Sequence, residues 1–269
     1  MLNIYIVSLR KDTERRKTIG KILDDFGLQY EFIDAVYGKE LSENELNSIR
    51  AKSTGAILTR GQRATPGEIG CTLSHIKTYQ KILDNKLNWA CILEDDVILD
   101  ERFKKFITTF QDTKLDPKAL YILGGQNGLN QTHITKSNKN YHFIGGQKFH
   151  KTIKSEYVIC RTCCYLMSSC LANQMIELSQ SNFIIADDWG YLSKSSIIKK
   201  IYLSDFVDHP LDLSTSHIQK ERELAGLNKV INYPKAKNSF SIIVKRSLKS
   251  KLRVLILKLY KYIEKKDPL

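Results

Sequence analysis

In the first half of the chain, short continuous apolar runs alternate with stretches in which apolar residues recur every three or four positions. Short runs rich in Ile, Val, Leu and Tyr predict buried strands at residues 3–9, 30–35, 89–93 and 119–123. Between these runs, apolar residues recur every three or four positions, which predicts amphipathic helices. A strand, a helix and a second strand at the start of the chain predict a parallel pair with a right-handed crossover. We therefore expect an α/β fold with a mostly parallel sheet flanked by helices.

Other parts of the chain have a less regular pattern of apolar and polar positions. Residues 54–67 are punctuated by Gly and Pro, and residues 125–154 are rich in Gly, Asn and Lys with weak periodicity, so we expect both stretches to be loops. Apolar runs predict further strands at residues 157–167 and 197–203, and helical spacing predicts a helix at residues 171–178.

Most of the net charge lies at the C-terminal end of the chain. The 269 residues carry a formal charge of +13, and residues 235–269 hold 11 Lys or Arg and two acids, so this end contributes +9 and the body only +4. The same end has five apolar residues at helical spacing, Leu248, Leu252, Leu255, Leu259 and Ile263. We expect a globular domain over residues 1–235 and a basic amphipathic helix in a tail over residues 236–269. Such a helix would lie on an anionic membrane surface or pack against the body.

Apolar run lengths and cysteine usage bear on the compartment. No run reaches the roughly 18 uninterrupted apolar residues of a transmembrane helix, and the N-terminus lacks the basic leader of a signal peptide. We expect reduced cysteines and a cytoplasmic protein that is peripheral at the inner membrane. Cys160, Cys163 and Cys164 lack the second Cys pair or nearby His of a zinc site, so we expect them to be buried thiols.

Candidate chemistry begins with three acids that follow an apolar run. Glu94, Asp95 and Asp96 come directly after the strand predicted at residues 89–93. Ligands of open α/β sheets bind beyond the carboxyl ends of the strands, and adjacent carboxylates suit Mg²⁺ or Mn²⁺ shared with a phosphate. The alternative is a helix N-terminus, where acidic residues are also favoured.

Several short motifs, taken together, carry a family resemblance. They lie at residues 6–10 with Arg15 and Arg16, 65–71 with 73–75, 92–97, 162–166 and 187–189. Over roughly residues 1–220 the chain resembles glycosyltransferase family 25, the bacterial lipooligosaccharide galactosyltransferase family. The resemblance implies a GT-A type fold, a UDP-sugar donor, inverting transfer and a metal-binding acidic motif. It makes Asp96 the expected direct ligand of the metal, with Glu94 as the other outer member of the motif.

The remaining site residues follow from strand ends and from the resemblance. Donor contacts are expected from residues near the first and third strands: Arg10, Arg15, Arg16, His75, Glu94 and Asp95. The resemblance places the base that deprotonates the acceptor hydroxyl at Asp188, with Asp187 as the alternate, and it suggests a downstream imidazole, His209 or else His217, as a metal ligand. Each residue also has a structural alternative: solvated helix faces for the arginines, a packed core position for His75, a helix cap for the Asp pair and a surface loop for the histidines.

The expected function is metal-dependent inverting transfer of galactose from UDP-galactose to a sugar hydroxyl of the lipooligosaccharide core, with Mn²⁺ or Mg²⁺ as cofactor. The expected partners are the UDP-sugar, a glycan acceptor and an anionic membrane. The alternative is a non-catalytic basic protein that contacts nucleic acid or membrane through its tail. Nucleic-acid binders usually spread basic and aromatic residues over a face of the folded domain. The body is nearly balanced in charge, so we expect no nucleic acid.

Overall fold

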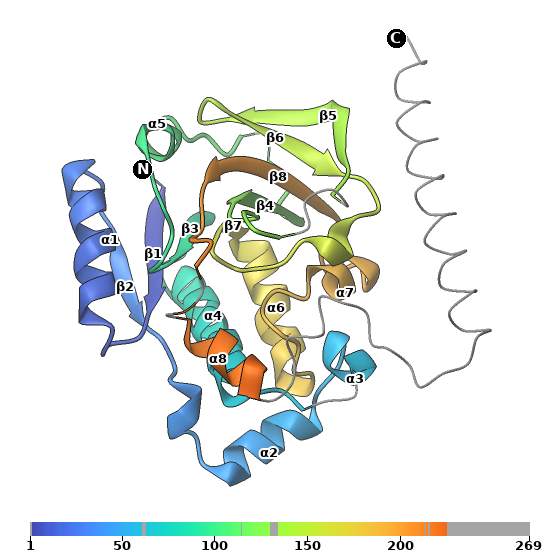
Figure 1. The fold of residues 1–269 in the computed structure, drawn as a ribbon. Coiled ribbons are helices and arrows are strands. Elements are labelled where there is room, and N and C mark those ends of the chain that lie inside the picture. Colours follow the sequence, from blue (N-terminus) through green and yellow to red (C-terminus); the bar gives the residue numbers. More distant parts are fainter. Residues whose placement is uncertain are drawn as a thin grey trace.

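The computed structural model describes residues 2–60, 63–113, 115–129, 134–212, 214 and 216–224, and the predicted amphipathic helix of the tail lies outside them. The described strands are β1 (Asn3–Ser8), β2 (Glu31–Asp34), β3 (Trp89–Glu94), β4 (Ala119–Gly124), β5 (Lys136–Ile144), β6 (Gln147–Thr152), β7 (Cys164–Ser168) and β8 (Lys200–Val207). They form one eight-stranded sheet in the order β2-β1-β3-β7-β4-β8-β6-β5 (Figure 1).

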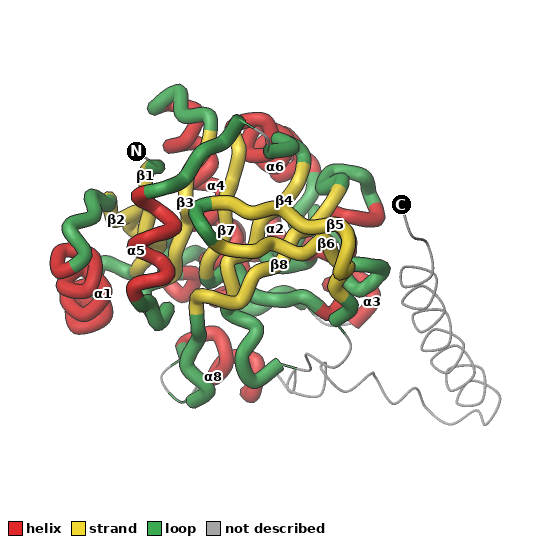
Figure 2. Tube along the Cα trace, turned by 90° about the horizontal axis from the view of Figure 1, so that it is seen from above, coloured by secondary structure: helices red, strands yellow, loops and turns green. Residues whose placement is uncertain are grey.

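The predicted α/β fold is confirmed. Strand β1 pairs in parallel with β2 and with β3, and β4 pairs in parallel with β8. Strand β7 runs antiparallel between β3 and β4, so the two parallel groups point the same way. The β5–β6 hairpin extends the sheet at one end, as Figure 2 shows. The carboxyl ends of β1, β3, β4 and β8 therefore meet along one edge of the sheet.

Helices cover both faces of this sheet. The described helices are α1 (Thr13–Asp25), α2 (Glu43–Ala51), α3 (Ala56–Arg60), α4 (Pro66–Asp84), α5 (Glu101–Thr108), α6 (Ser169–Ser181), α7 (Trp189–Lys194) and α8 (His217–Leu224). Successive strand residues point to opposite faces, so in β3 the side chains of Cys91 and Leu93 pack with α1 and α5, whereas those of Ala90 and Ile92 pack with α4, α6 and α7. Figure 1 shows α4 and α6 side by side on the second face.

Three predictions of secondary structure from the sequence were wrong. The stretch 125–154, expected to be a loop, contains the β5–β6 hairpin, whose turn is Gly145-Gly146 with φ of +53° and +76°. Such a two-residue turn suits glycine. The strand was missed because the middle of β5 is exposed and polar on both faces, so its sequence lacks the alternation of apolar and polar residues that marks a strand. The strand predicted at residues 157–167 begins only at Cys164. The loop predicted at residues 54–67 contains the short helix α3.

Helix α4 carries several site residues, and its start is tightly fixed. The Thr65 side chain accepts from the Glu68 amide while the Glu68 carboxylate accepts from the Thr65 amide, a capping box. The first turn packs directly on the short 3₁₀ helix Gly38–Glu40. A Cβ atom at Gly70 would stand 2.5 Å from the Val36 carbonyl oxygen, so only glycine fits at this approach.

We expect Gly70→Ala to lower the free energy of unfolding by about 1–3 kcal/mol, because backbone must move to admit the methyl group. Urea denaturation measures the effect. The matched control is Gly20→Ala on α1, where the added Cβ would meet only the tip of the Tyr30 side chain, at 2.8 Å. That flexible ring can shift, so a small change is expected. Equal losses in both variants would contradict the close approach at Gly70.

Candidate active site

The register of the sheet brings the end of β1 to the acidic triplet. Val7 stands opposite Glu94 in the parallel β1–β3 pair, so the next residues, Ser8 and Asp95, meet just beyond the strands. The Ser8 hydroxyl donates to Asp95 Oδ2 at 2.6 Å. Asp95 is therefore held by the fold at the carboxyl edge of the sheet.

Arg15 of α1 bridges the second and third acids. Its Nη1 donates to Asp95 Oδ1 at 3.1 Å and to Asp96 Oδ2 at 3.3 Å. Burial raises the pKa of both carboxyls, because a charged carboxylate loses its water there, and the Glu94 carboxylate raises the pKa of Asp96 further. The Arg15 guanidinium opposes these effects in part. The triplet is thus a site where further positive charge would be stabilising.

Asp96 faces an imidazole across a gap. An antiparallel bridge between Ile98 and Asp208 draws the chain after β8 back to the triplet. His209 Nε2 then lies 3.8 Å from Asp96 Oδ1, and His209 Nδ1 donates to the Pro210 carbonyl at 2.8 Å. The carbonyl can only accept, so in the neutral ring Nε2 carries a lone pair. Asp96 Oδ1 is buried and has no hydrogen-bond partner among the described residues.

This pair fits a divalent cation. An unpartnered buried carboxylate oxygen and an imidazole lone pair face each other, and the carbonyl that fixes the histidine tautomer is the usual outer partner of a metal-bound histidine. Carboxylate oxygens suit Mg²⁺ and Mn²⁺, and the imidazole favours the transition metal of the two. The structure brings together Asp96 and His209, two of the four candidate metal ligands named from the sequence, with Glu94 close by.

Glu94 is held from the other side of the crevice. Its amide donates to the Cys163 carbonyl at 2.9 Å, and the Thr162 hydroxyl donates to its Oε1. His75 of α4 places Nε2 3.5 Å from the same oxygen, while His75 Nδ1 is hydrogen-bonded to the Tyr165 hydroxyl at 2.7 Å. The buried position of His75, 1 % exposed, is the packed alternative that the sequence left open.

The two acids after residue 186 have different surroundings. Asp188 caps α7, because its Oδ1 accepts from the Tyr191 amide at 3.2 Å and its Oδ2 accepts from the Ala56 amide at 2.7 Å. Asp187 accepts one hydrogen bond at Oδ2, from the Arg161 amide at 2.8 Å. The helix-capping alternative thus describes Asp188, the member of the pair that the sequence favoured as base.

Asp187 lies on the crevice side of this segment. Thr72 of α4 pins the preceding residues, since its hydroxyl donates to the Ile184 carbonyl and accepts from the Ala186 amide. Burial raises the pKa of the Cys71 thiol, one helical turn before His75, and the charges of Glu94 and Asp187 raise it further. Asp187 and Glu94 therefore both act on this thiol.

A positive charge reaches the crevice from α8. Arg222 Nε donates to Glu68 Oε1 at 3.0 Å, and the Glu68 side chain is fully buried at the start of α4. Burial would lower the pKa of Arg222, but the carboxylates of Asp187 and Glu68 outweigh it and hold that pKa above its ordinary value. Arg222 is thus a fixed cation between two acids beside the crevice.

Two other predicted donor residues contact Asp34, and the alternative metal ligand His217 lies on α8. Arg16 donates to the Ser8 carbonyl and to Asp34 Oδ1, both at 2.7 Å, and so ties β1 to β2. Arg10 is 3.3 Å from Asp34 Oδ2 and its side chain is 85 % exposed. His217 begins α8, but its side chain lies outside the described part.

Four residues of the site were not predicted as site residues. Ser8 and Thr162 lie within the short motifs of the sequence, and that position was their only signal. Arg161 and Arg222 lie outside the motifs. Arg222 contacts Glu68, which is 154 positions away in the chain. Contacts of that range depend on the whole topology.

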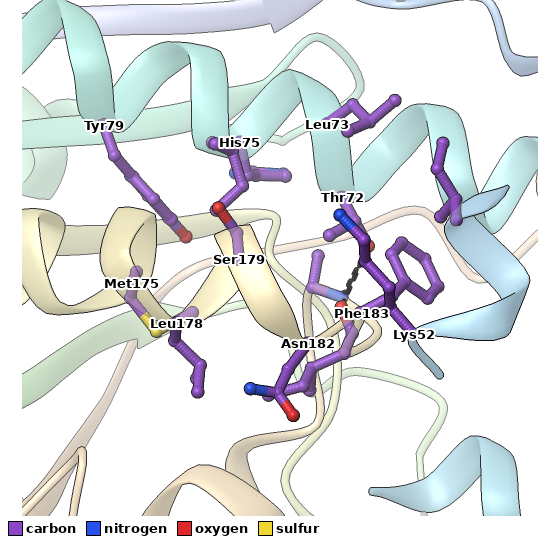
Figure 3. A pocket seen from close by; sticks show the side chains of 14 residues that line it. Lys52, Thr72, Leu73, His75, Tyr79, Met175, Leu178, Ser179, Asn182 and Phe183 are labelled. Carbon is purple, nitrogen blue, oxygen red and sulfur yellow. Dashed lines mark hydrogen bonds between the residues drawn. The ribbon is translucent and has the colours of Figure 1, made fainter. Parts of the chain in front are cut away.

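Two cavities border the site. One of about 210 Å³ lies between α4 and α6, and Figure 3 shows His75 and Tyr79 projecting into it beside Met175 and Leu178. The described residues that line it include no carboxylate, so they offer no acidic ligand for a metal ion. The other, of about 200 Å³, opens at the ends of β4 and β8, and its lining includes Asn127 and Asp208.

The fold and the acidic strand end have the form of an α/β enzyme that binds a ligand at the carboxyl edge of its sheet. A family model described as glycosyltransferase family 25 (LPS biosynthesis protein) matches residues 1–189. The chain belongs to this family, and it is a glycosyltransferase by family.

The relatives of this chain match less than half of it. Procollagen galactosyltransferase 1-A of Xenopus laevis is 27 % identical over 125 residues, which is 44 % of this chain and 20 % of the relative. A glycosyltransferase 25 family member of Aedes aegypti is 32 % identical over 112 residues, 41 % of this chain and 18 % of the relative. The chain therefore spans about a fifth of the length of these relatives.

Among solved structures, a glycosyltransferase involved in the glycosylation of the major capsid of PBCV-1 covers 84 % of this chain and 98 % of its own, with a TM-score of 0.41 and 11 % identity. A likeness this distant carries no further argument. Within the described residues, every helix is too short or too polar to cross a membrane.

Proposed function

We propose that this chain transfers galactose from UDP-galactose to a sugar hydroxyl of the lipooligosaccharide core, with inversion and with Mn²⁺ or Mg²⁺ as cofactor. The observation that carries the proposal is the gap between Asp96 Oδ1 and His209 Nε2, 3.8 Å wide, at a strand end of a family 25 chain. A buried carboxylate oxygen without a partner among the described residues calls for a cation.

The residues around this gap have separate roles in the proposal. Asp96 and His209 hold the cation, and Glu94, the other outer member of the acidic motif, stands next to this pair in the sequence and fold. When bound, the cation supplies a Lewis acid that neutralises charge on the leaving diphosphate. Arg15 orients Asp96 and neutralises part of the triplet, and Ser8 fixes Asp95 through the 2.6 Å hydrogen bond.

Asp187 is the base in this proposal, in place of Asp188. A base must come within hydrogen-bond reach of the acceptor hydroxyl, and both Asp188 oxygens are taken by backbone amides. The Arg161 amide holds one oxygen of Asp187, which orients the carboxylate. Asp187 then accepts the hydroxyl proton as the acceptor oxygen attacks the sugar carbon opposite the departing UDP.

Donor and acceptor identities rest on the comparisons. The family description names LPS biosynthesis, and the Xenopus relative is named a galactosyltransferase. The polar cavity at the ends of β4 and β8 offers amide and carboxylate groups of the kind that bind sugar hydroxyls. The family description and the polar groups of the cavity support a glycan acceptor, and the name of the Xenopus relative is the support for galactose.

A panel of UDP-sugars tests the donor without knowledge of the acceptor. The full chain is incubated with Mn²⁺ and with UDP-galactose, UDP-glucose or UDP-N-acetylglucosamine, and released UDP is measured. We expect UDP-galactose to be hydrolysed fastest. Faster hydrolysis of another UDP-sugar would reassign the donor, and release of no UDP from any of the three would count against a UDP-sugar donor.

We further propose that the tail over residues 236–269 holds the enzyme on an anionic membrane. Each Lys or Arg near the surface contributes on the order of 1 kcal/mol. The full chain should therefore sediment with phosphatidylglycerol liposomes at low salt, and less at high salt because screening weakens the attraction. A chain that ends at residue 235 should stay in solution and keep its activity on a soluble acceptor. Aggregation of the truncated chain would instead show that the tail packs on the body.

A further inference from the structure

A second group of metal-ligating atoms lies beside the crevice, on α4. Cys71 and His75 are one helical turn apart and face the end of β3, where Glu94 stands. One ligand atom from each of the three residues lies within 4.8 Å of the other two. Two ligands at positions i and i+4 of a helix, completed by an acid from another element, are a known geometry for zinc.

His75 gives independent evidence for a ligand here. Its Nδ1 is hydrogen-bonded to the Tyr165 hydroxyl, while its Nε2 is buried and has no hydrogen-bond partner among the described residues. The nearest acceptor, Glu94 Oε1, is 3.5 Å away, which is longer than an N–H···O hydrogen bond. A buried imidazole nitrogen without a hydrogen bond lowers the stability of the fold, because it has lost its bond to water and gained none in return.

The separation of these two atoms suits a shared ion. Ligand atoms about 2.1 Å from a tetrahedral zinc ion stand roughly 3.4 Å apart, close to the 3.5 Å between His75 Nε2 and Glu94 Oε1. Both ligands also have outer partners of the kind found around metals, the Tyr165 hydroxyl on His75 and the Thr162 hydroxyl on Glu94.

We propose that Cys71, His75 and Glu94 form a second metal site that takes Zn²⁺. The thiolate and imidazole ligands select a softer ion than the carboxylate-rich pair Asp96 and His209. On binding, a Zn–S bond replaces the S–H bond of Cys71, and the proton leaves to solvent. Cys71 and Glu94 are both partly exposed, so the ion can enter from the crevice.

The test uses the full chain, stripped of metal under reducing conditions, with Co²⁺ as a spectroscopic probe. We expect one equivalent of Co²⁺ to give the near-ultraviolet charge-transfer absorption of a cobalt–thiolate bond, and Zn²⁺ to displace it. Cys71→Ser and His75→Gln should lose this absorption. Cys160→Ser is the matched control and should keep it, because Cys160 lies outside the cluster.

Two further variants separate this site from the proposed catalytic metal. Asp96→Asn should leave the cobalt–thiolate absorption unchanged, whatever it does to transfer. Tyr165→Phe should weaken Zn²⁺ binding ~10–100-fold, the usual effect of losing an outer partner of a histidine ligand, and Cys71→Ser should weaken it more. Absence of thiolate absorption in the wild-type chain, its persistence in Cys71→Ser, or unchanged Zn²⁺ affinity in that variant would overturn the proposal.

Discussion

Asp187→Asn is expected to lower kcat for galactosyl transfer by ~10²–10⁴-fold, the usual contribution of a positioned base. The amide keeps the size of the side chain and can still accept from the Arg161 amide, so the fold and the affinity for UDP-galactose should change little. Steady-state kinetics with a saturating acceptor gives kcat, and calorimetry gives the donor affinity. A loss in kcat with unchanged donor binding is the signature of a group that acts on the acceptor.

Asp188→Asn is the matched control for this experiment. It makes the same chemical change one position along, at a residue whose oxygens hold the Tyr191 and Ala56 amides. Asn caps a helix about as well as Asp, so the expected effect is a loss of about 1 kcal/mol in stability from the weaker contact to Ala56. Loss of transfer in Asp188→Asn with full activity in Asp187→Asn would reverse the proposed assignment.

Asp96→Asn is expected to lower kcat/KM by ~10³-fold or more, because a catalytic cation stabilises the transition state by several kcal/mol. Treatment of the wild-type enzyme with EDTA should abolish transfer, and added Mn²⁺ should restore it. The substitution removes a charge that burial and Glu94 already disfavour, so the free energy of unfolding should not fall sharply.

Asp100→Asn provides the comparison for Asp96→Asn. Asp100 caps α5 only a few residues away, and its side chain is about half exposed. It should therefore keep full transfer activity and full response to Mn²⁺. Undiminished activity of Asp96→Asn, or of the wild-type enzyme in EDTA, would rule out the proposed role of the metal.

Local signals in the sequence were sufficient for the sheet around the site. The apolar run that ends at Glu94 predicted β3 and its position at a ligand-binding edge, because burial on both faces requires such a run. Ser42 and Glu45 have the spacing of a capping box in the sequence, and the structure has both hydrogen bonds of that box at the start of α2. These features depend on residues a few positions apart.

Features that depend on distant partners were not predictable in the same way. Asp187 and Asp188 are chemically identical neighbours, and the contact that distinguishes them is an amide at Ala56, 132 positions away. The orientation of His209 depends on the bridge between Ile98 and Asp208, which forms only when β8 has joined the sheet. The cluster of Cys71 with Glu94 likewise requires α4 to be packed on β3. A sequence pattern fixes which elements form, and tertiary packing decides which of two adjacent side chains faces the crevice.

The most direct test of the account is the Mn²⁺ dependence of UDP binding, measured by calorimetry on the full wild-type chain and on Asp96→Asn and His209→Ala. We expect Mn²⁺ to tighten UDP binding to the wild type by about 5–150-fold, the usual range for two coupled ligands. In either variant this tightening should largely disappear, while the weak binding without metal should remain. Equal affinity of the wild type for UDP with and without Mn²⁺, or full tightening in Asp96→Asn, would contradict a metal held between Asp96 and His209.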